Sequence, residues 1–148
     1  MAESSQAKIL IADDNPQGAE LIEAYLSDTN YLVKTVSDGE QALRMVQEWE
    51  PDLLLLDIMM PRMSGFEVCK RLRGDTKTRH LPVIMVTALD QHVDVERAVD
   101  AGTDDFISKP IRQNELLLRI ESLLKARHCH DDLERTLSYL ENLQTSAS

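Results

Sequence analysis

Five short apolar runs, separated by segments with helical signals, constrain the fold of this chain more than any other feature. The runs cover residues 9–12, 31–36, 53–56, 83–88 and 106–108. The first, third and fourth are nearly continuous in Ile, Leu and Val, which is typical of parallel strands covered on both faces. The second run contains Lys34 and Thr35, and the fifth is short, so these two are predicted to be edge strands.

Helical signals fill the gaps between the runs. They comprise an N-cap followed by proline, two pairs with capping-box spacing, and two glycines at expected helix ends: Asn15-Pro16, Asp38 with Gln41, Ser64 with Glu67, Gly74 and Gly102. A strand followed by a helix, repeated five times, predicts an α/β fold in which five helices cover both faces of a five-stranded, doubly wound parallel sheet. Right-handed crossovers then place the reversal of strand order beside the first strand.

Polar residues gather where the predicted strands end. Asp13 and Asp14 follow the first run, and Asp57 follows the four leucines of the third. Thr87 lies at the end of the fourth run, and Lys109 follows the fifth. Because ligands of open α/β sheets bind at the carboxyl ends of the strands, these five side chains are predicted to form one site. Each has an ordinary explanation when taken singly, such as an acidic pair favoured by a helix dipole, but together they favour a site.

The chemistry of this predicted site is that of phosphoryl transfer. A carboxylate after an apolar strand is costly unless it is paired, hydrogen-bonded or bound to a metal. Three converging carboxylates raise one another's pKa values unless a cation intervenes, and a set of oxygen ligands favours Mg²⁺. Lys109 supplies a positive charge, and Thr87 a hydrogen-bond donor, for phosphoryl oxygens. Asp57, at the centre, is the candidate nucleophile that forms an aspartyl phosphate.

These motifs make the chain similar to the receiver domain of two-component response regulators over about residues 8–126. Four elements in order carry the resemblance: the pair Asp13-Asp14, LLLLDIMMPRMSG around Asp57, VIMVTA with Thr87, and AGTDDFISKP ending at Lys109 and Pro110. The resemblance implies the flavodoxin-like strand order 2-1-3-4-5. It also implies a phosphorelay signalling protein rather than a metabolic enzyme.

The resemblance assigns a role to each acidic residue of the site. It implies that Asp14, Asp57 and the backbone carbonyl of Met59 hold Mg²⁺, with Asp13 assisting through water. It implies that Asp57 accepts a phosphoryl group from a histidine kinase or a histidine phosphotransfer protein. The expected cofactor is therefore Mg²⁺, and the expected partner is the phosphodonor protein.

The resemblance also implies a conformational switch. Thr87 and Lys109 are expected to contact the phosphoryl oxygens, and the ring of Phe106 to reorient. The peptide bond between Lys109 and Pro110 is expected to be cis, which X-Pro bonds adopt at modest cost. The face made of the fourth helix, fifth strand and fifth helix would then change and control a partner or an output domain.

Two apolar side chains beside the site predict a long-lived phosphoryl group. Met59 lies two residues beyond Asp57, and Leu89 lies two residues beyond Thr87. Neither side chain orients a water molecule by hydrogen bonding, and both make the mouth of the site less accessible to water. Self-dephosphorylation is therefore expected to be slow.

Bulk properties limit the partners and the location. The formal net charge of −10 argues against direct contact with nucleic acid or with an anionic membrane surface. No run approaches the ~20 apolar residues of a membrane span, and the N-terminus has no signal-peptide h-region. Cys69 and Cys129 make no disulfide framework, so a cytoplasmic protein is expected.

The expected domain organisation is a disordered segment over residues 1–7, one domain over residues 8–126 and a helical extension over residues 127–148. Within the extension, Leu133, Leu137 and Leu140 have 4-3 spacing, which favours a coiled coil or linker. A helix folded back on its own domain is the alternative. Similar helices link receivers to output domains such as diguanylate cyclases, so the chain is either a stand-alone regulator or one whose effector has been removed.

A homodimer on phosphorylation is expected, through the face of the fourth helix, fifth strand and fifth helix and the leucines of the extension. The charged residues assigned to that face are Arg97, Asp100, Asp104, Asp105 and Arg119. Such a surface suits a two-fold dimer. Asp104 and Asp105 are otherwise expected to be solvated turn residues, and the resemblance adds pairing with Arg97 or Arg119 across the dimer.

Two rival functions share parts of this pattern. A hydrolase of the haloacid dehalogenase type also forms an aspartyl phosphate, but it needs an acid/base carboxylate two residues beyond its nucleophile, where this chain has Met59. A flavodoxin-type mononucleotide binder needs a Ser/Thr-rich phosphate loop after the first strand. Here the sequence DDNP places two negative charges in that loop, which would repel a flavin phosphate. The receiver hypothesis is therefore preferred.

Overall fold

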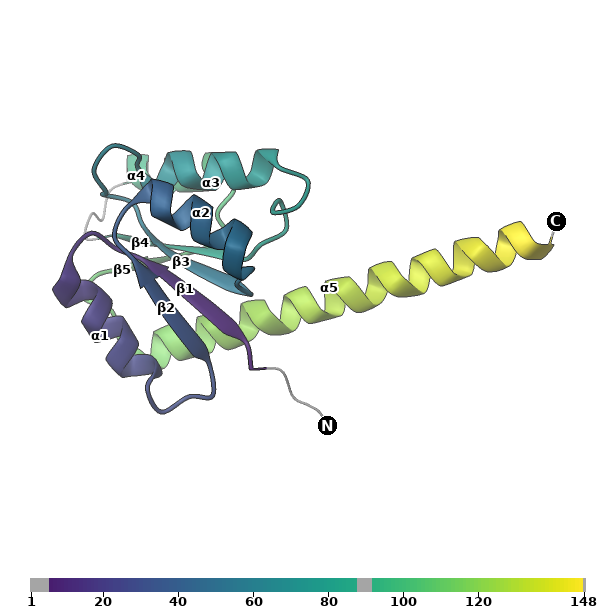
Figure 1. Ribbon diagram of the computed structural model, residues 1–148, viewed down its shortest axis with the longest axis horizontal. Helices are drawn as coiled ribbons and strands as arrows, with labels where there is room; N and C mark the ends of the chain where they lie inside the picture. Colours follow the sequence, from purple (N-terminus) through teal and green to yellow (C-terminus); the bar gives the residue numbers. More distant parts are fainter. Residues whose placement is uncertain (1–5, 88–91, 148) are drawn as a thin grey trace.

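A sheet of five parallel strands forms the centre of the computed structural model, which describes residues 6–87 and 92–147. The strand order is β2-β1-β3-β4-β5 (Figure 1). The strands are β1 (Lys8–Ala12), β2 (Leu32–Val36), β3 (Leu53–Asp57), β4 (Val83–Thr87) and β5 (Asp105–Ser108). The predicted doubly wound sheet with the order 2-1-3-4-5 is confirmed.

Five helices alternate with the strands and cover both faces of the sheet. They are α1 (Pro16–Leu26), α2 (Gly39–Trp49), α3 (Gly65–Gly74), α4 (His92–Ala101) and α5 (Gln113–Ala147). Helices α1 and α5 lie on one face, and α2, α3 and α4 lie on the other (Figure 1). The side chains of Asn15, Asp38 and Ser64 each accept a hydrogen bond from a backbone N–H in the first turn of their helix. The three predicted N-caps are therefore confirmed.

The core has one apolar layer on each side of the sheet, because successive side chains of a strand point to opposite faces. Strands β3 and β4 are buried along their whole length, which explains their nearly continuous apolar sequences. Strand β2 is mostly exposed or half-buried, and β5 has a single buried residue. Both occupy edges of the sheet, as their interrupted or short sequences predicted.

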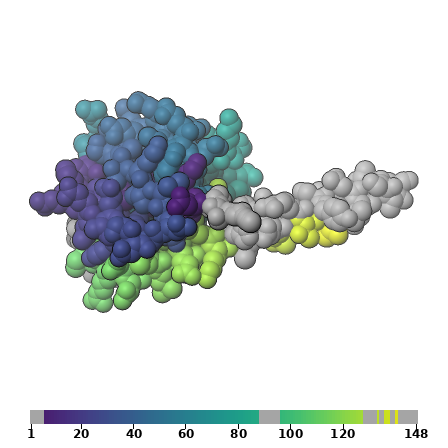
Figure 2. Space-filling view, turned by 60° about the horizontal axis from the view of Figure 1, so that its bottom comes forward, coloured from purple at the N-terminus to yellow at the C-terminus, as the bar shows by residue number. Residues whose placement is uncertain are grey.

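Some expected boundaries differ from the observed elements. Strand β5 begins at Asp105, one residue before the fifth apolar run. Ala88, at the end of the fourth run, and residues 1–5 of the expected N-terminal segment lie outside the described residues. Helix α5 packs along one side of the domain and continues well beyond it (Figures 1 and 2). Among the described residues, no helix has the combined length and apolar character needed to cross a bilayer, α5 included.

The turn between α4 and β5 is held by an arginine from α3. Arg73 Nη2 lies 2.7 Å from the Asp104 carboxylate, which also accepts a hydrogen bond of 2.8 Å from the backbone N–H of Val83. Arg73 Nε donates to the carbonyl of Gly102 at 2.8 Å. Gly102 has a φ of 95°, a conformation that favours glycine, so it ends α4 as predicted. Asp104 is exposed in this turn, as expected, although its carboxylate also binds Arg73 and the Val83 N–H. The expectation of a solvated turn is wrong for Asp105, which is the half-buried first residue of β5.

Candidate functional site

The carboxyl ends of four neighbouring strands bring the predicted site residues to one edge of the sheet. Asp13 directly follows β1, Asp57 ends β3 and Thr87 ends β4. Lys109 follows β5, and its backbone N–H donates a hydrogen bond of 2.7 Å to the carbonyl of Thr87. Because the order β1-β3-β4-β5 makes these strands neighbours, residues far apart in the sequence become adjacent in space.

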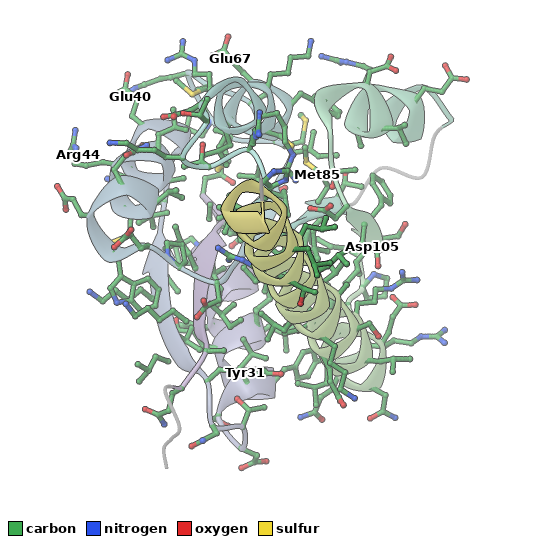
Figure 3. The ribbon with its side chains drawn as sticks, turned by 90° about the vertical axis from the view of Figure 1, so that its right-hand side faces the viewer. Tyr31, Glu40, Arg44, Glu67, Met85 and Asp105 are labelled. Carbon is green, nitrogen blue, oxygen red and sulfur yellow. The ribbon has the colours of Figure 1, made fainter. Side chains whose placement is uncertain are left out.

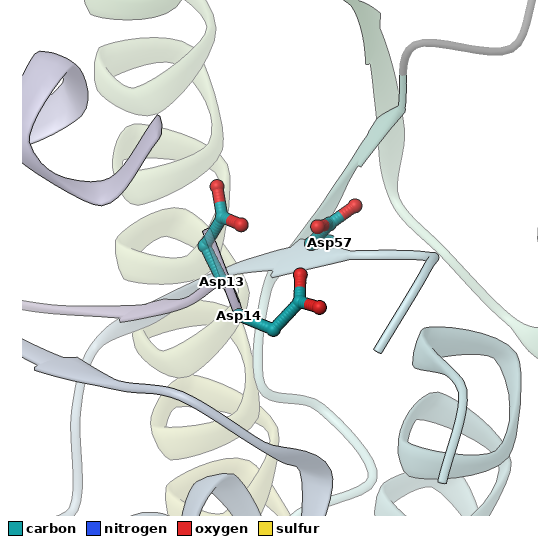
Figure 4. Close-up of side chains that lie close together, drawn as sticks. All are labelled: Asp13, Asp14 and Asp57. Carbon is teal, nitrogen blue, oxygen red and sulfur yellow. The ribbon is translucent and has the colours of Figure 1, made fainter. Parts of the chain in front are cut away.

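Three carboxylates converge at this edge. Asp13, Asp14 and Asp57 each offer one oxygen, and these oxygens lie within 4.8 Å of one another (Figure 4). Asp13 and Asp57 are buried, with 4% and 6% of their surfaces exposed, whereas Asp14 is exposed. The cluster is therefore buried on one side and open to water on the other.

The two oxygens of the Asp13 carboxylate have different surroundings. Oδ1 accepts a hydrogen bond of 2.9 Å from the backbone N–H of Asn15. Oδ2 lies 3.6 Å from Nζ of Lys109, and within the described part of the chain it is buried with no hydrogen-bond partner. A buried carboxylate oxygen without a donor is costly, so this oxygen calls for a cation or an ordered water molecule.

The environment of Asp57 favours its protonated form. Its pKa is raised to about 7, chiefly by burial; the positive charge of Lys109 opposes this rise, and the negative charge of Asp13 adds to it. The backbone N–H of Met59 donates to Asp57 Oδ1 at 3.2 Å and opposes the rise. A divalent cation would stabilise the ionised form, because it would offset both the desolvation and the repulsion by Asp13.

A dependence of stability on pH follows from this pKa. The native state binds a proton at Asp57 more tightly than the unfolded chain does, so stability is expected to fall as the pH rises from 3.8 to about 7. Without screening the loss would be about 4 kcal/mol, but water reaches the open side of the cluster, so we expect on the order of 1–2 kcal/mol. Asp57→Asn should therefore gain stability relative to the unmodified protein between about pH 4 and pH 8.

Thermal unfolding of the unmodified protein and of Asp57→Asn, at pH 4 and pH 8 in the presence of a chelator, measures this gain in stability. Saturating Mg²⁺ should reduce the gain at the higher pH, because the cation stabilises the ionised carboxylate. A difference between the two proteins that is the same at both pH values would contradict the raised pKa of Asp57.

Two glycines make room for the acidic cluster. A Cβ at Gly18 would lie 2.5 Å from Asp13 Oδ2 and 3.7 Å from Nζ of Lys109. A Cβ at Gly65 would lie 2.5 Å from the carbonyl oxygen of Asp57. Sequence reasoning gave neither residue a role. Each glycine lies in the first turn of a helix, although glycine has a poor helix propensity. This position was the sequence feature that could have indicated a close contact there.

The other predicted residues that the structure describes lie on β4 and β5 or directly after β3 and β5. Met59 is 62% exposed, and Phe106 is half-buried against the apolar layer under α2, α3 and α4. Thr87 is fully buried. The Lys109–Pro110 peptide bond is cis, the form that the resemblance implies. Leu89 lies outside the described residues.

The donor set at this edge suits a hard divalent cation. All side-chain ligands are carboxylate oxygens, as Mg²⁺ prefers, and one of them is buried without a hydrogen-bond donor in the described structure. The open side of the cluster, at Asp14, leaves positions for water and for an incoming group. The arrangement can therefore hold a cation and present Asp57 to an anionic ligand.

Comparisons with known proteins agree with this geometry. The family model of the response regulator receiver domain matches residues 9–121. The response regulator PleD of Caulobacter vibrioides is 42% identical over 129 residues, which cover 87% of this chain and 28% of PleD. The DNA-binding dual master transcriptional regulator RpaA of Synechocystis is 40% identical over 118 residues, which cover 80% of this chain and 49% of RpaA. The chain therefore spans less than half the length of either relative.

A solved structure of similar fold has a metal ion in its site. The receiver domain of a sensor histidine kinase from Pseudomonas aeruginosa, with a magnesium ion coordinated in its active site cleft, is 30% identical to this chain. The two structures superpose with a TM-score of 0.76, covering 82% of this chain and 99% of that one.

Proposed function

We propose that this chain, which belongs to the family of response regulator receiver domains, accepts a phosphoryl group on the carboxylate of Asp57 with the help of Mg²⁺. The observation that carries the proposal is the convergence of three carboxylates around a buried Asp13 oxygen without a hydrogen-bond donor in the described structure, with Lys109 3.6 Å away. The named relatives are response regulators and transcriptional regulators, not metabolic enzymes.

The acidic residues would share the metal in a defined way. Asp14, Asp57 and the backbone carbonyl of Met59 would hold Mg²⁺, and Asp13 would assist through a water molecule. When bound, the ion would neutralise part of the charge on the transferring group. Asp13 Oδ2 is buried without a hydrogen-bond donor in the described structure, so it could accept a hydrogen bond from that water molecule.

The protein side chains would then carry the transfer. An oxygen of the Asp57 carboxylate attacks phosphorus, a P–O bond forms, and the P–N bond to the donor histidine breaks with its electron pair moving to nitrogen. Lys109 and Thr87 would bind the phosphoryl oxygens from the neighbouring strand ends. Phe106, half-buried on β5, would reorient and change the face of α4, β5 and α5.

Labelling with a small phosphodonor tests the proposed function. Incubation with acetyl phosphate and Mg²⁺ should add one phosphoryl group, found by mass spectrometry on the peptide that contains Asp57. A chelator should prevent the labelling. No labelling in the presence of Mg²⁺, or labelling on another residue, would contradict the proposal.

The upstream and downstream partners follow from the same proposal. The phosphodonor would be a histidine kinase or a histidine phosphotransfer protein, and the exchange would take place in the cytoplasm. The extent of the domain is proposed as residues 8–126, with α5 as the link to an output domain or partner. Because the chain has a net charge of −10, we expect no direct contact with nucleic acid by this domain.

Two charged residues of the proposed dimer face already make contacts within their own chain. Nη1 of Arg119 on α5 lies 2.6 Å from Asp105 Oδ1, and Asp105 lies beside α5 (Figure 3). The guanidinium of Arg97 lies 4.3 Å from the centre of the Phe66 ring, so Arg97 faces α3 in this state. Forming a dimer through these residues would therefore require both contacts to be exchanged.

The later part of α5 offers an apolar stripe to a second copy. Leu133, Leu137 and Leu140 are 58%, 51% and 49% exposed. Arg119 and Ala126 lie seven residues apart and continue the spacing back from Leu133, so the stripe runs on the same side of the helix as the charged face. This continuity supports a parallel, two-fold dimer of the phosphorylated form.

Replacing the stripe tests the dimer. Leu133→Glu with Leu137→Glu should lower the dimer affinity of the phosphorylated protein by roughly a hundredfold, because two charges would enter an apolar seam. Ser138→Glu with Lys125→Glu makes the same helix more acidic at positions that the 4-3 spacing places outside the seam, and it should have little effect. Sedimentation with and without phosphodonor measures the outcome, and a monomer at high concentration in all forms would refute the dimer.

Two apolar residues predict the lifetime of the phosphoryl group: Met59, two positions beyond Asp57, and Leu89, two positions beyond Thr87 in the sequence. Met59→Asn with Leu89→Glu should speed loss of the label on the order of tenfold, because an amide and an acid can orient the attacking water. Leu118→Asn makes a similar change at a remote exposed position and serves as the control. The rate is measured by following the labelled mass after removal of the phosphodonor. An unmodified protein that loses its label as fast as the double variant would contradict this explanation.

A further inference from the structure

The end of the molecule opposite the acidic cluster carries a concentration of positive charge. Five of the 16 Lys and Arg residues lie within residues 70–80, accompanied by a single acidic residue: Lys70, Arg71, Arg73, Lys77 and Arg79, with Asp75. The chain as a whole has a net charge of −10. Charge is therefore segregated, and this segment differs in sign from most of the surface.

The segment contributes to two neighbouring cavities. Residues 75–82 connect α3 to β4 on the side of the domain from which α5 leaves (Figure 1). One cavity, of about 220 Å³, is lined by Lys77, and the other, of about 240 Å³, by Arg79. His80 and Arg127 line both cavities. These four residues define the basic groove.

The structure describes few ion pairs for the basic groove. In the described part of the chain, neither Lys77 nor Arg79 has a side-chain ion pair. Among the described residues, Arg127 donates to a backbone carbonyl, that of Asp52 at 2.9 Å. The carboxylate of Asp104 lines the second cavity, but its charge is already paired with Arg73 at 2.7 Å. Of the described residues that line the first cavity, one is acidic, Glu50.

We propose that the basic groove is a docking site for an acidic segment of a partner protein. Each cavity is smaller than the ~300–1,000 Å³ typical of small-molecule sites, and long charged side chains line both. Cations spread over the α3–β4 connection and α5 fit an extended chain of carboxylates better than a single compact anion.

Charge complementarity would also orient such a partner. An acidic segment is repelled by most of a surface with a net charge of −10, and it is attracted only where positive charge is concentrated. The basic groove lies beside α5 and at the opposite end of the sheet from Asp57, so docking there leaves the acidic cluster free. The inference does not depend on the proposed phosphorylation.

Binding of an acidic peptide to the full chain tests the docking site. The probe is a fluorescent peptide of alternating Glu and Ser. Its binding is measured by fluorescence anisotropy at low and at physiological ionic strength. Lys77→Glu with Arg79→Glu should weaken binding on the order of tenfold. Arg44→Glu with Arg112→Glu changes the net charge equally at exposed positions elsewhere, and Arg44 projects from α2 away from α5 (Figure 3). This control should bind as the unmodified protein does.

The outcomes are distinct. Weaker peptide binding by the Lys77 and Arg79 variant alone, with an unchanged circular dichroism spectrum, supports the docking site. The same result in a protein that also carries Asp57→Asn shows that docking is independent of phosphorylation. An equal loss of peptide affinity in both double variants, or no peptide binding by the unmodified protein, overturns the proposal. Inorganic pyrophosphate that binds at these residues while the peptide does not would also overturn it, because the groove would then be a site for a small anion.

Discussion

Asp57→Asn is expected to abolish labelling by acetyl phosphate under conditions that label the unmodified protein fully. The amide has nearly the same shape as the carboxylate, but it is neutral and a poor nucleophile, so the phosphoryl acceptor is lost while the site keeps its packing. Because no other described carboxylate lies at the end of the central strand β3, we expect no second acceptor to take over. Mass spectrometry of the intact protein measures the label.

Asp14→Asn is the matched control for this experiment. It also removes one carboxylate from the cluster, but it leaves the acceptor in place and weakens only the binding of Mg²⁺. Its labelling should be slow at low Mg²⁺ and should recover as the concentration of Mg²⁺ increases. Asp57→Asn should not recover. Undiminished labelling of Asp57→Asn would place the acceptor elsewhere, for instance on Asp13.

The fold was predictable from the sequence because burial determines the composition of each strand. Leucine at every position from Leu53 to Leu56 suits only a strand covered on both faces, whereas Lys34 within the second strand suits an edge. Once the strands are parallel and the crossovers right-handed, few orders of the sheet are available. The same rule placed the site, because parallel strands all end at one edge.

Ion pairs and close contacts between side chains were not predictable from the sequence, unlike the strands and the site at their ends. Asp104 is exposed, as expected, but its ion pair with Arg73, 31 positions earlier in the sequence and 2.7 Å away, was not predicted. The contact of Arg97 with the ring of Phe66 was not predicted either. Such contacts depend on the relative positions of two packed helices and on side-chain rotamers, and neither leaves a periodic signal in the sequence.

Gly65 is the clearest example of a residue whose importance depends on a tertiary contact. It is the first residue of α3, and its backbone N–H donates to the carbonyl of Ile58 at 2.9 Å. A Cβ at this position would lie 2.5 Å from the carbonyl oxygen of Asp57 and 2.9 Å from Cα of Ile58. Both contacts are with backbone atoms, which cannot move aside as the end of a flexible side chain does.

Gly65→Ala is therefore expected to lower the free energy of unfolding by about 2–3 kcal/mol. This corresponds to a decrease in melting temperature on the order of 5–10 °C for a chain of this size. Gly74→Ala, at the other end of the same helix, is the control, because no atom lies within 4 Å of a Cβ there. It should be neutral or raise the free energy of unfolding by about 0.5–1 kcal/mol, since alanine restricts the unfolded chain.

The two variants also separate a loss of stability from a loss of site geometry. Relief of the clash at Gly65 must move either α3 or the backbone of Asp57, so Gly65→Ala should label more slowly than the unmodified protein at saturating Mg²⁺ and at a temperature where both are folded. Gly74→Ala should label at the unmodified rate. If both variants had unchanged stability and labelling rates, the close approach of α3 would not position the acceptor, and the lack of a side chain at Gly65 would need another cause.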